Sequence, residues 1–158
     1  MQIWNTLFGK LLMTVLVSML PVVELRGAIP IAVAQGLDFR AAICAAIIGN
    51  LIPVPFLILF VRRIFAWLRK LSHWLDGLVR RVEQNAEKHT DLVMRSTFWG
   101  LVILVAIPFP GTGAWTGAIV AAMLNMRLKR AFPAIALGVV IAGVIVSFVT
   151  YGAGSVLG

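Results

Sequence analysis

Two long runs of apolar residues without any charge are the strongest pattern in the chain. They cover residues 41–61 and 131–151, and each is 21 residues long. A helix of that length rises about 30 Å, which matches the hydrocarbon thickness of a bilayer. We therefore predict two transmembrane helices in an all-α integral membrane protein.

Three other apolar stretches are too short to cross a bilayer as helices. Residues 25–35, 98–107 and 119–124 would each span roughly 17 Å or less. Proline and glycine interrupt the chain beside them, at residues 21–30 and in the segment PFPGTGAWTG at residues 108–117. Short apolar helices joined by such breaks are typical of re-entrant hairpins, which reach the middle of the membrane and return to the same side. The alternative is four full-length helices that carry these prolines.

Basic residues place the connecting segments on opposite sides of the membrane. Most Lys and Arg lie within residues 62–95 and in the short loop at residues 127–130, whereas the loop at residues 36–40 holds one Asp and one Arg. Because cytoplasmic loops are enriched in Lys and Arg, we place the first two inside and the third outside. A hairpin at residues 1–36 then enters from outside, one at residues 98–124 enters from inside, and both termini lie outside.

This arrangement makes the chain one membrane domain, residues 1–158, built as an inverted repeat. An offset of 87 residues aligns Pro21 with Pro108 and Arg40 with Arg127, which gives the repeat weak support. Paired interrupted helices in two halves of a chain indicate the binding site of a transporter. The predicted parts are a first hairpin and span at residues 1–61, a basic amphipathic cytoplasmic linker at 62–96, and a second hairpin and span at 97–158.

The linker has the periodicity of an amphipathic helix. In residues 61–84, apolar residues recur three and four positions apart, Trp67 and Trp74 widen the apolar face, and arginine and lysine occupy the rest. One interpretation is a helix on the inner leaflet, with tryptophan at headgroup depth and basic side chains on anionic lipid. The other is a helix that packs on a second copy in a dimer, or on the following helix. We favour the first because arginine and tryptophan suit a lipid surface.

Composition narrows the function classes further. Hydrophobic residues make up 61% of the chain, and cytoplasmic loops explain the formal net charge of +8, so we expect no nucleic-acid partner. The one cysteine, Cys44, cannot form a disulfide within the chain. His73 and His89 have no metal-ligand spacing, and the chain has no catalytic motif. We expect neither an enzyme nor a bound metal or cofactor.

Glu24 and Arg26 are charged residues near the tip of the first predicted hairpin. A charge buried at this depth must be paired, neutralised or hydrated in a cavity. One interpretation makes Glu24 a static helix cap in a salt bridge with Arg26. The other makes Glu24 a titrating group that couples transport to protons, with Arg26 as its partner or as an anchor for an anion. Gln35 and Asn50 are also at membrane depth, and Asn50 either faces the pathway or bonds carbonyls freed by Pro53.

The tip of the second predicted hairpin is uncharged. Its glycines allow close approach of a ligand or of the other hairpin, or else close packing of helices. Threonine hydroxyls, a tryptophan ring and the N–H groups of the following half-helix complete a polar wall. The candidate pathway for substrate and protons comprises Glu24, Arg26, Gly27, Pro30, Gln35, Asn50, Pro108, Pro110, Gly111, Thr112, Gly113, Trp115 and Thr116.

Two motifs carry a family resemblance that covers essentially the whole chain. ELRGAIP at residues 24–30, followed after a basic helix by PFPGTGAWTGA at residues 108–118, resembles the small multidrug export protein family. That family is similar in architecture to the larger DedA-type membrane proteins, which have two oppositely oriented re-entrant hairpins and are implicated in proton-coupled movement of polyprenyl-phosphate or other lipids. By this resemblance Glu24 matches the acidic position of the first hairpin. DedA-type proteins also place arginines around the second hairpin, whereas here the nearest lie beyond it, at residues 127–130.

The residues and the resemblance together predict a carrier of the bacterial inner membrane. It would export small molecules or move an amphiphilic, lipid-like substrate, with Glu24 as the proton-coupling group and the two hairpin tips as the walls of the site. The alternatives are a polyprenyl-phosphate or phospholipid translocase, and a membrane scaffold that transports nothing. We expect membrane lipids, a substrate and protons as partners, and a homodimer because one chain supplies only two spans and two hairpins.

Overall fold

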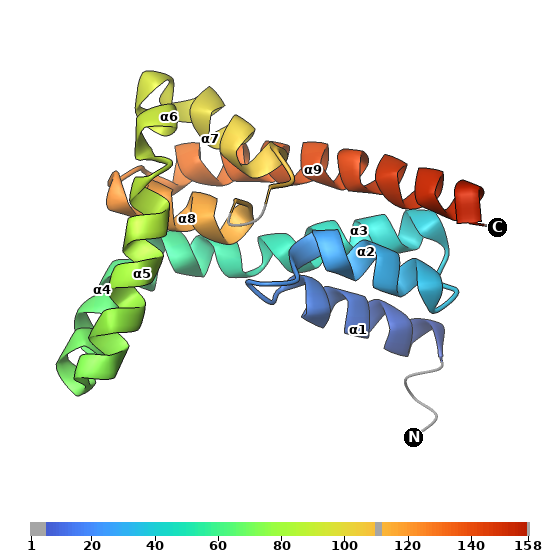
Figure 1. Ribbon diagram of the computed structural model, residues 1–158, viewed down its shortest axis with the longest axis horizontal. Coiled ribbons are helices and arrows are strands. Elements are labelled where there is room, and N and C mark those ends of the chain that lie inside the picture. The colour runs from blue at the N-terminus through green and yellow to red at the C-terminus, as the bar shows by residue number, and fades with distance from the viewer. Residues whose placement is uncertain (1–5, 110–111, 158) are drawn as a thin grey trace. The chain divides into compact units, whose positions relative to one another are not determined.

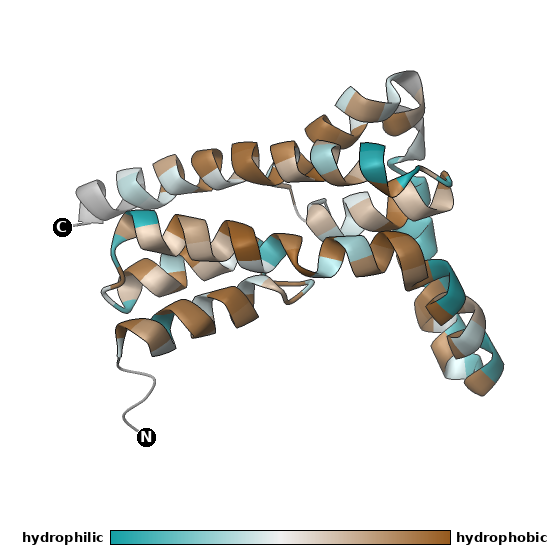
Figure 2. Cartoon of the chain, turned by 180° about the vertical axis from the view of Figure 1, so that it is seen from behind, coloured by the Kyte–Doolittle hydropathy of each residue, from teal (hydrophilic) through white to brown (hydrophobic). Residues whose placement is uncertain are grey.

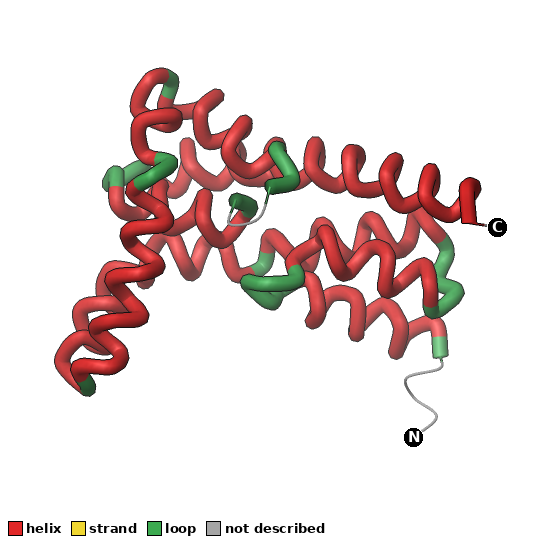
Figure 3. The backbone as a smooth tube through the Cα atoms, in the orientation of Figure 1, coloured by secondary structure: helices red, strands yellow, loops and turns green. Residues whose placement is uncertain are grey.

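The structure, a computed structural model, describes residues 6–109 and 112–157 of the chain. All the secondary-structure elements formed by these residues are helices, and these residues contain no β-strand (Figure 1 and Figure 3). The all-α prediction is therefore confirmed. The helices are α1 (Leu7–Ser18), α2 (Glu24–Ala34), α3 (Phe39–Leu51), α4 (Pro53–Leu71), α5 (His73–Glu87), α6 (Thr90–Arg95), α7 (Thr97–Ala106), α8 (Ala114–Met123) and α9 (Leu128–Leu157).

Within the described residues, two helical segments are long and apolar enough to cross a membrane. They are Phe39–Leu71, which combines α3 and α4, and Leu128–Gly152 of α9. They contain the spans predicted at residues 41–61 and 131–151, and Figure 2 shows them mostly in the colour of hydrophobic residues. By length alone, the 33 residues of the first segment are more than the roughly 20 that cross a hydrocarbon core as a helix.

Contacts divide the chain into two compact units. The first unit is Met1–Pro53 with Val139–Gly158, and it holds α1, α2, α3 and the last part of α9. The second unit is Val54–Gly138, and it holds α4 from its second residue, α5 to α8 and the first part of α9. Each unit thus contains one pair of short helices, α1 with α2 or α7 with α8.

In the first unit, small residues let α1 approach α3 closely. Ala42, Ala45, Ala46 and Gly49 recur three or four positions apart on α3 and are buried. A Cβ added to Gly49 would lie 2.4 Å from the carbonyl oxygen of Val15 on α1, so a larger residue requires a shift of backbone. α2 packs against both helices, and the three lie side by side in Figure 1. Close contact through small residues is a common way for membrane helices to associate.

The same backbone features recur in the two units at one offset. Glu24 begins α2 with a φ of 49°, and Gly113, which lies 89 residues later, precedes α8 with a φ of 138°. Gly36 follows α2 with a φ of 75°, and Asn125, also 89 residues later, follows α8 with a φ of 53°. Left-handed residues therefore mark both ends of the second helix in each pair.

The turns after α2 and α8 also close with matching hydrogen bonds. The amide of Leu37 donates to the carbonyl of Ala32 (3.0 Å), and the amide of Met126 donates to that of Ala121 (2.9 Å). Both belong to the Schellman motif, which ends helices at a left-handed residue. α3 and α9 begin 89 residues apart as well. The helix ends thus recur at an offset of 89, two residues more than the offset of 87 that aligns Pro21 with Pro108 and Arg40 with Arg127.

The linker differs from the single long helix predicted at residues 61–84. α4 ends at Leu71 and α5 begins at His73, with Ser72 between them in extended backbone (φ −160°, ψ 144°). The Ser72 hydroxyl accepts a hydrogen bond from the amide of Trp74 (3.4 Å), so it caps α5. A serine cap offers the backbone an alternative to a continued helix, which apolar periodicity does not reveal. α4 and α5 are consequently two amphipathic helices joined by a tight turn.

Candidate functional site

Glu24 is a buried acidic residue of the first unit, and it begins α2. Its exposed fraction is 6%, and its φ of 49° lies in the left-handed region that non-glycine residues seldom adopt. Such backbone costs about 1–3 kcal/mol and persists where the surrounding structure enforces it. Glu24 therefore combines a buried ionisable side chain with a strained backbone, and both features are typical of functional sites.

The residues that follow Glu24 are held close to it by the start of α2. Arg26 is half-buried, and its guanidinium interacts electrostatically with the Glu24 carboxylate. A Cβ on Gly27 would lie 2.4 Å from Cγ1 of Val23, so glycine allows the tight entry into the helix. Pro30, inside α2, has no N–H to donate to the carbonyl of Arg26. Four of the predicted pathway residues thus belong to one short helical stretch.

The end of α1 joins this region to the end of α3. Ser18 is fully buried, and its hydroxyl donates a hydrogen bond to the carbonyl of Ala46 on α3 (2.5 Å). Because Gly49 contacts the backbone of Val15, the last turns of α1 and α3 meet. A short connection leads from Ser18 to Glu24, so the start of α2 lies at this same end. Ser18 was not among the predicted pathway residues, and its signal in the sequence was a polar residue at the end of a mostly apolar helix.

Asn50, also at this end of α3, has a buried oxygen without a hydrogen-bond partner. The residue is 1% exposed, and Oδ1 is the one buried side-chain oxygen or nitrogen of the described residues that lacks a partner. An unpaired group of this kind costs about 1–3 kcal/mol. In native proteins such a group calls for an explanation, for example a ligand or a water that it receives. The free acceptor fits the interpretation in which Asn50 faces a pathway.

Buried polar side chains concentrate in the first unit. All the buried polar or charged residues among those described belong to it, whereas the described core of the second unit is apolar. The buried polar residues are Thr14, Ser18, Glu24, Asn50 and Ser147.

No group of three or more His, Cys, Asp and Glu that could hold a metal ion occurs in the described part of the chain.

Gln35 lies at the other end of α2. Its backbone carbonyl accepts a hydrogen bond from Nζ of Lys10 (2.6 Å), and its side-chain amide donates to Sδ of Met13 (3.6 Å). α2 has 11 residues and rises about 16 Å, so the structure separates Gln35 from Glu24. Of the pathway residues predicted in the first hairpin, Gln35 is thus the one that lies away from the stretch that holds Glu24, Arg26, Gly27 and Pro30.

The tip between α7 and α8 is stabilised by its own hydrogen bonds. Oγ1 of Thr112 lies 2.8 Å from the carbonyl oxygens of both Ile107 and Phe109, and it accepts a hydrogen bond from the amide of Phe109 (3.3 Å). The Thr112 hydroxyl is therefore engaged by the turn itself. Pro108 is exposed beside it. Two predicted residues of this tip lie outside the described residues: Pro110 and Gly111.

The glycines at the start of α8 serve the fold of the second unit. Gly113 has a φ of 138°, which favours glycine. A Cβ on Gly117 would lie 2.6 Å from Cγ2 of Val105 on α7, so Gly117 allows the two helices to pack closely. Trp115 and Thr116 lie on the first turn of α8 and are half-buried. Close packing, one of the two interpretations of these glycines, therefore accounts for Gly117.

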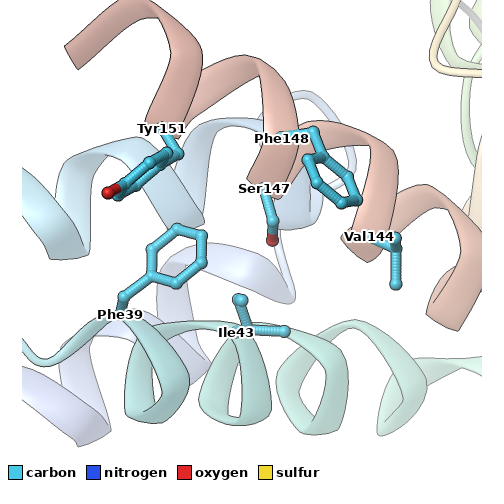
Figure 4. A pocket seen from close by; sticks show the side chains of 6 residues that line it. All are labelled: Phe39, Ile43, Val144, Ser147, Phe148 and Tyr151. Carbon is cyan, nitrogen blue, oxygen red and sulfur yellow. The ribbon is translucent and has the colours of Figure 1, made fainter. Parts of the chain in front are cut away.

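A pocket of about 400 Å³ lies within the first unit, between α3 and the last part of α9 (Figure 4). The ring centroids of Phe39 and Tyr151 are 6.1 Å apart at one end of it. The Ser147 hydroxyl donates to the carbonyl of Gly143 (2.6 Å), so the lining is apolar and aromatic, which suits an apolar part of a ligand. The sequence did not predict this pocket, because its two walls are far apart in the chain. The lining residues are Phe39, Ile43, Val144, Ser147, Phe148 and Tyr151.

A comparison with known protein families gives the family of this chain. The family model described as "Putative small multi-drug export protein" matches residues 24–145. The chain belongs to this family. The match begins at Glu24, at the buried start of α2, and includes the whole of α7 and α8, so the resemblance carried by the two motifs is confirmed. With its two long apolar segments, this member of the export family is a membrane protein. No curated protein and no solved structure matches the chain.

Proposed function

We propose that this export-family member is a membrane carrier that expels lipophilic small molecules in exchange for protons, with Glu24 as the proton-binding residue. One observation carries the proposal: Glu24 is buried in a strained backbone at the start of α2, beside Arg26. A proton-coupled carrier needs a group that can be charged or neutral in the same place. A buried carboxyl group meets that need, because burial and a nearby cation act on its charge in opposite directions.

Protonation of Glu24 would change what the site can bind. As a carboxylate, Glu24 accepts hydrogen bonds and interacts with the Arg26 cation. As a carboxylic acid, it gains an O–H donor and loses its charge, which weakens its attraction for Arg26. The unpaired oxygen of Asn50 is an acceptor at the same end of the first unit, available to a donor from Glu24 or from the substrate. One proton then switches the site between two hydrogen-bonding states.

In this proposal the apolar pocket binds the lipophilic part of the substrate. The pocket lies toward the start of α3, at Phe39 and Ile43, about 10 Å along the helix from Asn50. Its volume of about 400 Å³ lies in the range of small-molecule sites, roughly 300–1,000 Å³. The rings of Phe39 and Tyr151 favour a flat aromatic group, and no charged side chain lines the pocket. We therefore propose a neutral or weakly basic aromatic compound as the substrate class, rather than an anion.

In the membrane, α1 with α2 and α7 with α8 form the two re-entrant hairpins of the proposed inverted repeat. These helices have 12, 11, 10 and 10 residues, so each rises about 15–18 Å, roughly half of a hydrocarbon core. The recurrence of left-handed residues at an offset of 89 supports the repeat. Opposite insertion of the repeats puts the basic segments in the cytoplasm and both termini outside the inner membrane.

Transport by the purified protein in vesicles tests the role of Glu24. A pH gradient should drive movement of a lipophilic fluorescent dye in vesicles that hold the wild type, and Glu24→Gln should abolish the dependence on the gradient. Asp38→Asn is the matched control, because Asp38 is an exposed acid of the same unit that caps α3, and asparagine is an equally good cap. Equal gradient-driven transport in Glu24→Gln and the wild type would refute the proposal.

A further inference from the structure

α4 and α5 share one face on which their charged side chains pair. Arg69 of α4 forms ion pairs with Asp76 (3.8 Å) and Glu83 of α5. Arg80 pairs with Asp76 one turn earlier on α5 (2.9 Å). These contacts connect the two helices across the turn at Ser72 and define an ion-paired face.

The opposite face of the two helices is apolar and exposed. Trp67 lies two residues before Arg69, and Trp74 lies two residues before Asp76, so each tryptophan points about 200° around its helix from the ion-paired face. Their exposed fractions are 60% and 71%. We call this surface the tryptophan face, and its exposed members are Ile64, Trp67, Leu71, Trp74, Leu78 and Val82.

Four exposed basic residues follow the tryptophan face: Arg63, Lys70, Arg81 and Lys88. The first two lie within about one turn of Trp67, and the last two lie about two and four turns after Trp74 on the same side. None of the four forms an ion pair with a side chain that the structure describes, whereas Arg69 and Arg80 on the other face do. Of the other basic residues of α4 and α5, Arg69 and Arg80 are neutralised by acidic side chains, and Arg62 donates a hydrogen bond to Oδ1 of Asn125. The four residues beside the exposed tryptophans thus form a set without anionic partners among the described side chains.

We propose that the tryptophan face binds the anionic headgroup layer of the membrane. Indole rings prefer headgroup depth, and Lys and Arg side chains are attracted to anionic lipids. α4 completes the apolar segment Phe39–Leu71, and the predicted span ends at residue 61, so the tryptophan face begins at Ile64, just beyond the residues expected in the hydrocarbon. A second copy of the chain is the poorer occupant, because it would bring four like charges against these four. The proposal does not depend on Glu24 or on transport.

The fluorescence of Trp74 tests this contact in the full-length protein. The variant keeps Trp74 and has phenylalanine at the other four of the five tryptophans. It is reconstituted in vesicles of phosphatidylcholine alone, or of phosphatidylcholine with phosphatidylglycerol. With phosphatidylglycerol we expect a blue-shifted emission, several-fold weaker quenching by acrylamide and stronger quenching by brominated lipid. Sodium chloride at about 1 M should reduce this difference, because the Debye length falls to about 3 Å.

Charge variants of the protein that keeps only Trp74 show whether the four basic residues beside the tryptophan face cause the effect, or whether the positive charge of the whole protein does. Glutamine in place of the four basic residues beside the tryptophan face should abolish the effect of phosphatidylglycerol on the emission and quenching of Trp74. These four are Arg63, Lys70, Arg81 and Lys88. The control places glutamine at four basic residues outside α4 and α5: Arg40, Arg127, Lys129 and Arg130. An equal loss in the control would overturn the proposal, and so would equal acrylamide quenching in both kinds of vesicle. Shielding that rises with the protein-to-lipid ratio, without phosphatidylglycerol, would assign the face to a second copy. The measurement with sodium chloride uses no charge variant, so it still tests the proposal if a charge variant misfolds.

Discussion

The same substitution, glycine to alanine, should have opposite effects on stability at two positions of this protein. A Cβ at Gly49 would lie 2.4 Å from the carbonyl oxygen and 2.8 Å from Cα of Val15. Both are backbone atoms, so α1 and α3 would have to separate. A Cβ at Gly77 on α5 would meet no atom within 4 Å. Gly49→Ala therefore tests the contact between two helices, and Gly77→Ala tests helix propensity alone.

The expected free energies follow from the two environments. Overpacking of a close contact costs about 1–3 kcal/mol, and alanine gains about 0.5–1 kcal/mol over glycine inside a helix. Because the added Cβ of Gly49→Ala would lie 2.4 Å from a backbone oxygen, we expect an overpacking cost of about 2–3 kcal/mol. Less the helix gain, the free energy of unfolding should fall by about 1–2.5 kcal/mol. Gly77→Ala should raise it by about 0.5–1 kcal/mol, because nothing opposes the gain.

Unfolding in mixed micelles measures both effects in one preparation. Helical circular dichroism is followed as the fraction of sodium dodecyl sulfate rises, and the free energies are extrapolated to the same micelle composition. If Gly49→Ala were as stable as the wild type or more so, while Gly77→Ala gained stability, the close approach of α1 to α3 would be refuted.

Three further substitutions probe two places in the first unit, the buried polar end of α3 and the apolar pocket near its start. Asn50→Val removes the unpaired oxygen at similar volume, so the free energy of unfolding should rise by about 1–3 kcal/mol while transport falls; a loss of stability in the micelle assay would show that Oδ1 has a partner. Ser18→Ala removes the hydrogen bond to Ala46 and should cost about 0.5–1.5 kcal/mol in that assay, and an unchanged midpoint would contradict this. Phe148→Ala should weaken binding of an aromatic substrate, measured by equilibrium titration in detergent, without loss of stability because Phe148 is 75% exposed. Unchanged affinity would exclude the pocket.

The apolar segments of this fold could be predicted from the sequence because their signals are local. Length and the absence of charge predicted both long segments, and the two motifs predicted the family. The short helices on either side of the Pro and Gly breaks were also expected, since proline removes a backbone donor and glycine permits left-handed backbone. Glu24 stood out as a charge in an apolar stretch, and it proved to be buried.

Features that depend on turn geometry and on distant contacts could not be predicted in this way. Asn125 takes the left-handed position that Gly36 has in the first unit, so the two turns match in backbone and not in sequence. Ser72 ends one amphipathic helix and caps the next, although the apolar pattern continues through it. Asn50 is buried because it lies on the covered face of α3, whereas Ile48 and Ile52 nearby are exposed, and the sequence pattern does not show which face is covered.

Proton release on substrate binding tests the central claim, that Glu24 exchanges a proton for substrate. The purified protein in weakly buffered detergent is mixed with a lipophilic aromatic substrate, and a pH indicator records the protons released per substrate bound. The wild type and the control Asp38→Asn should release protons on binding, and Glu24→Gln should bind without release. Release of equal size from Glu24→Gln and the wild type would contradict the account.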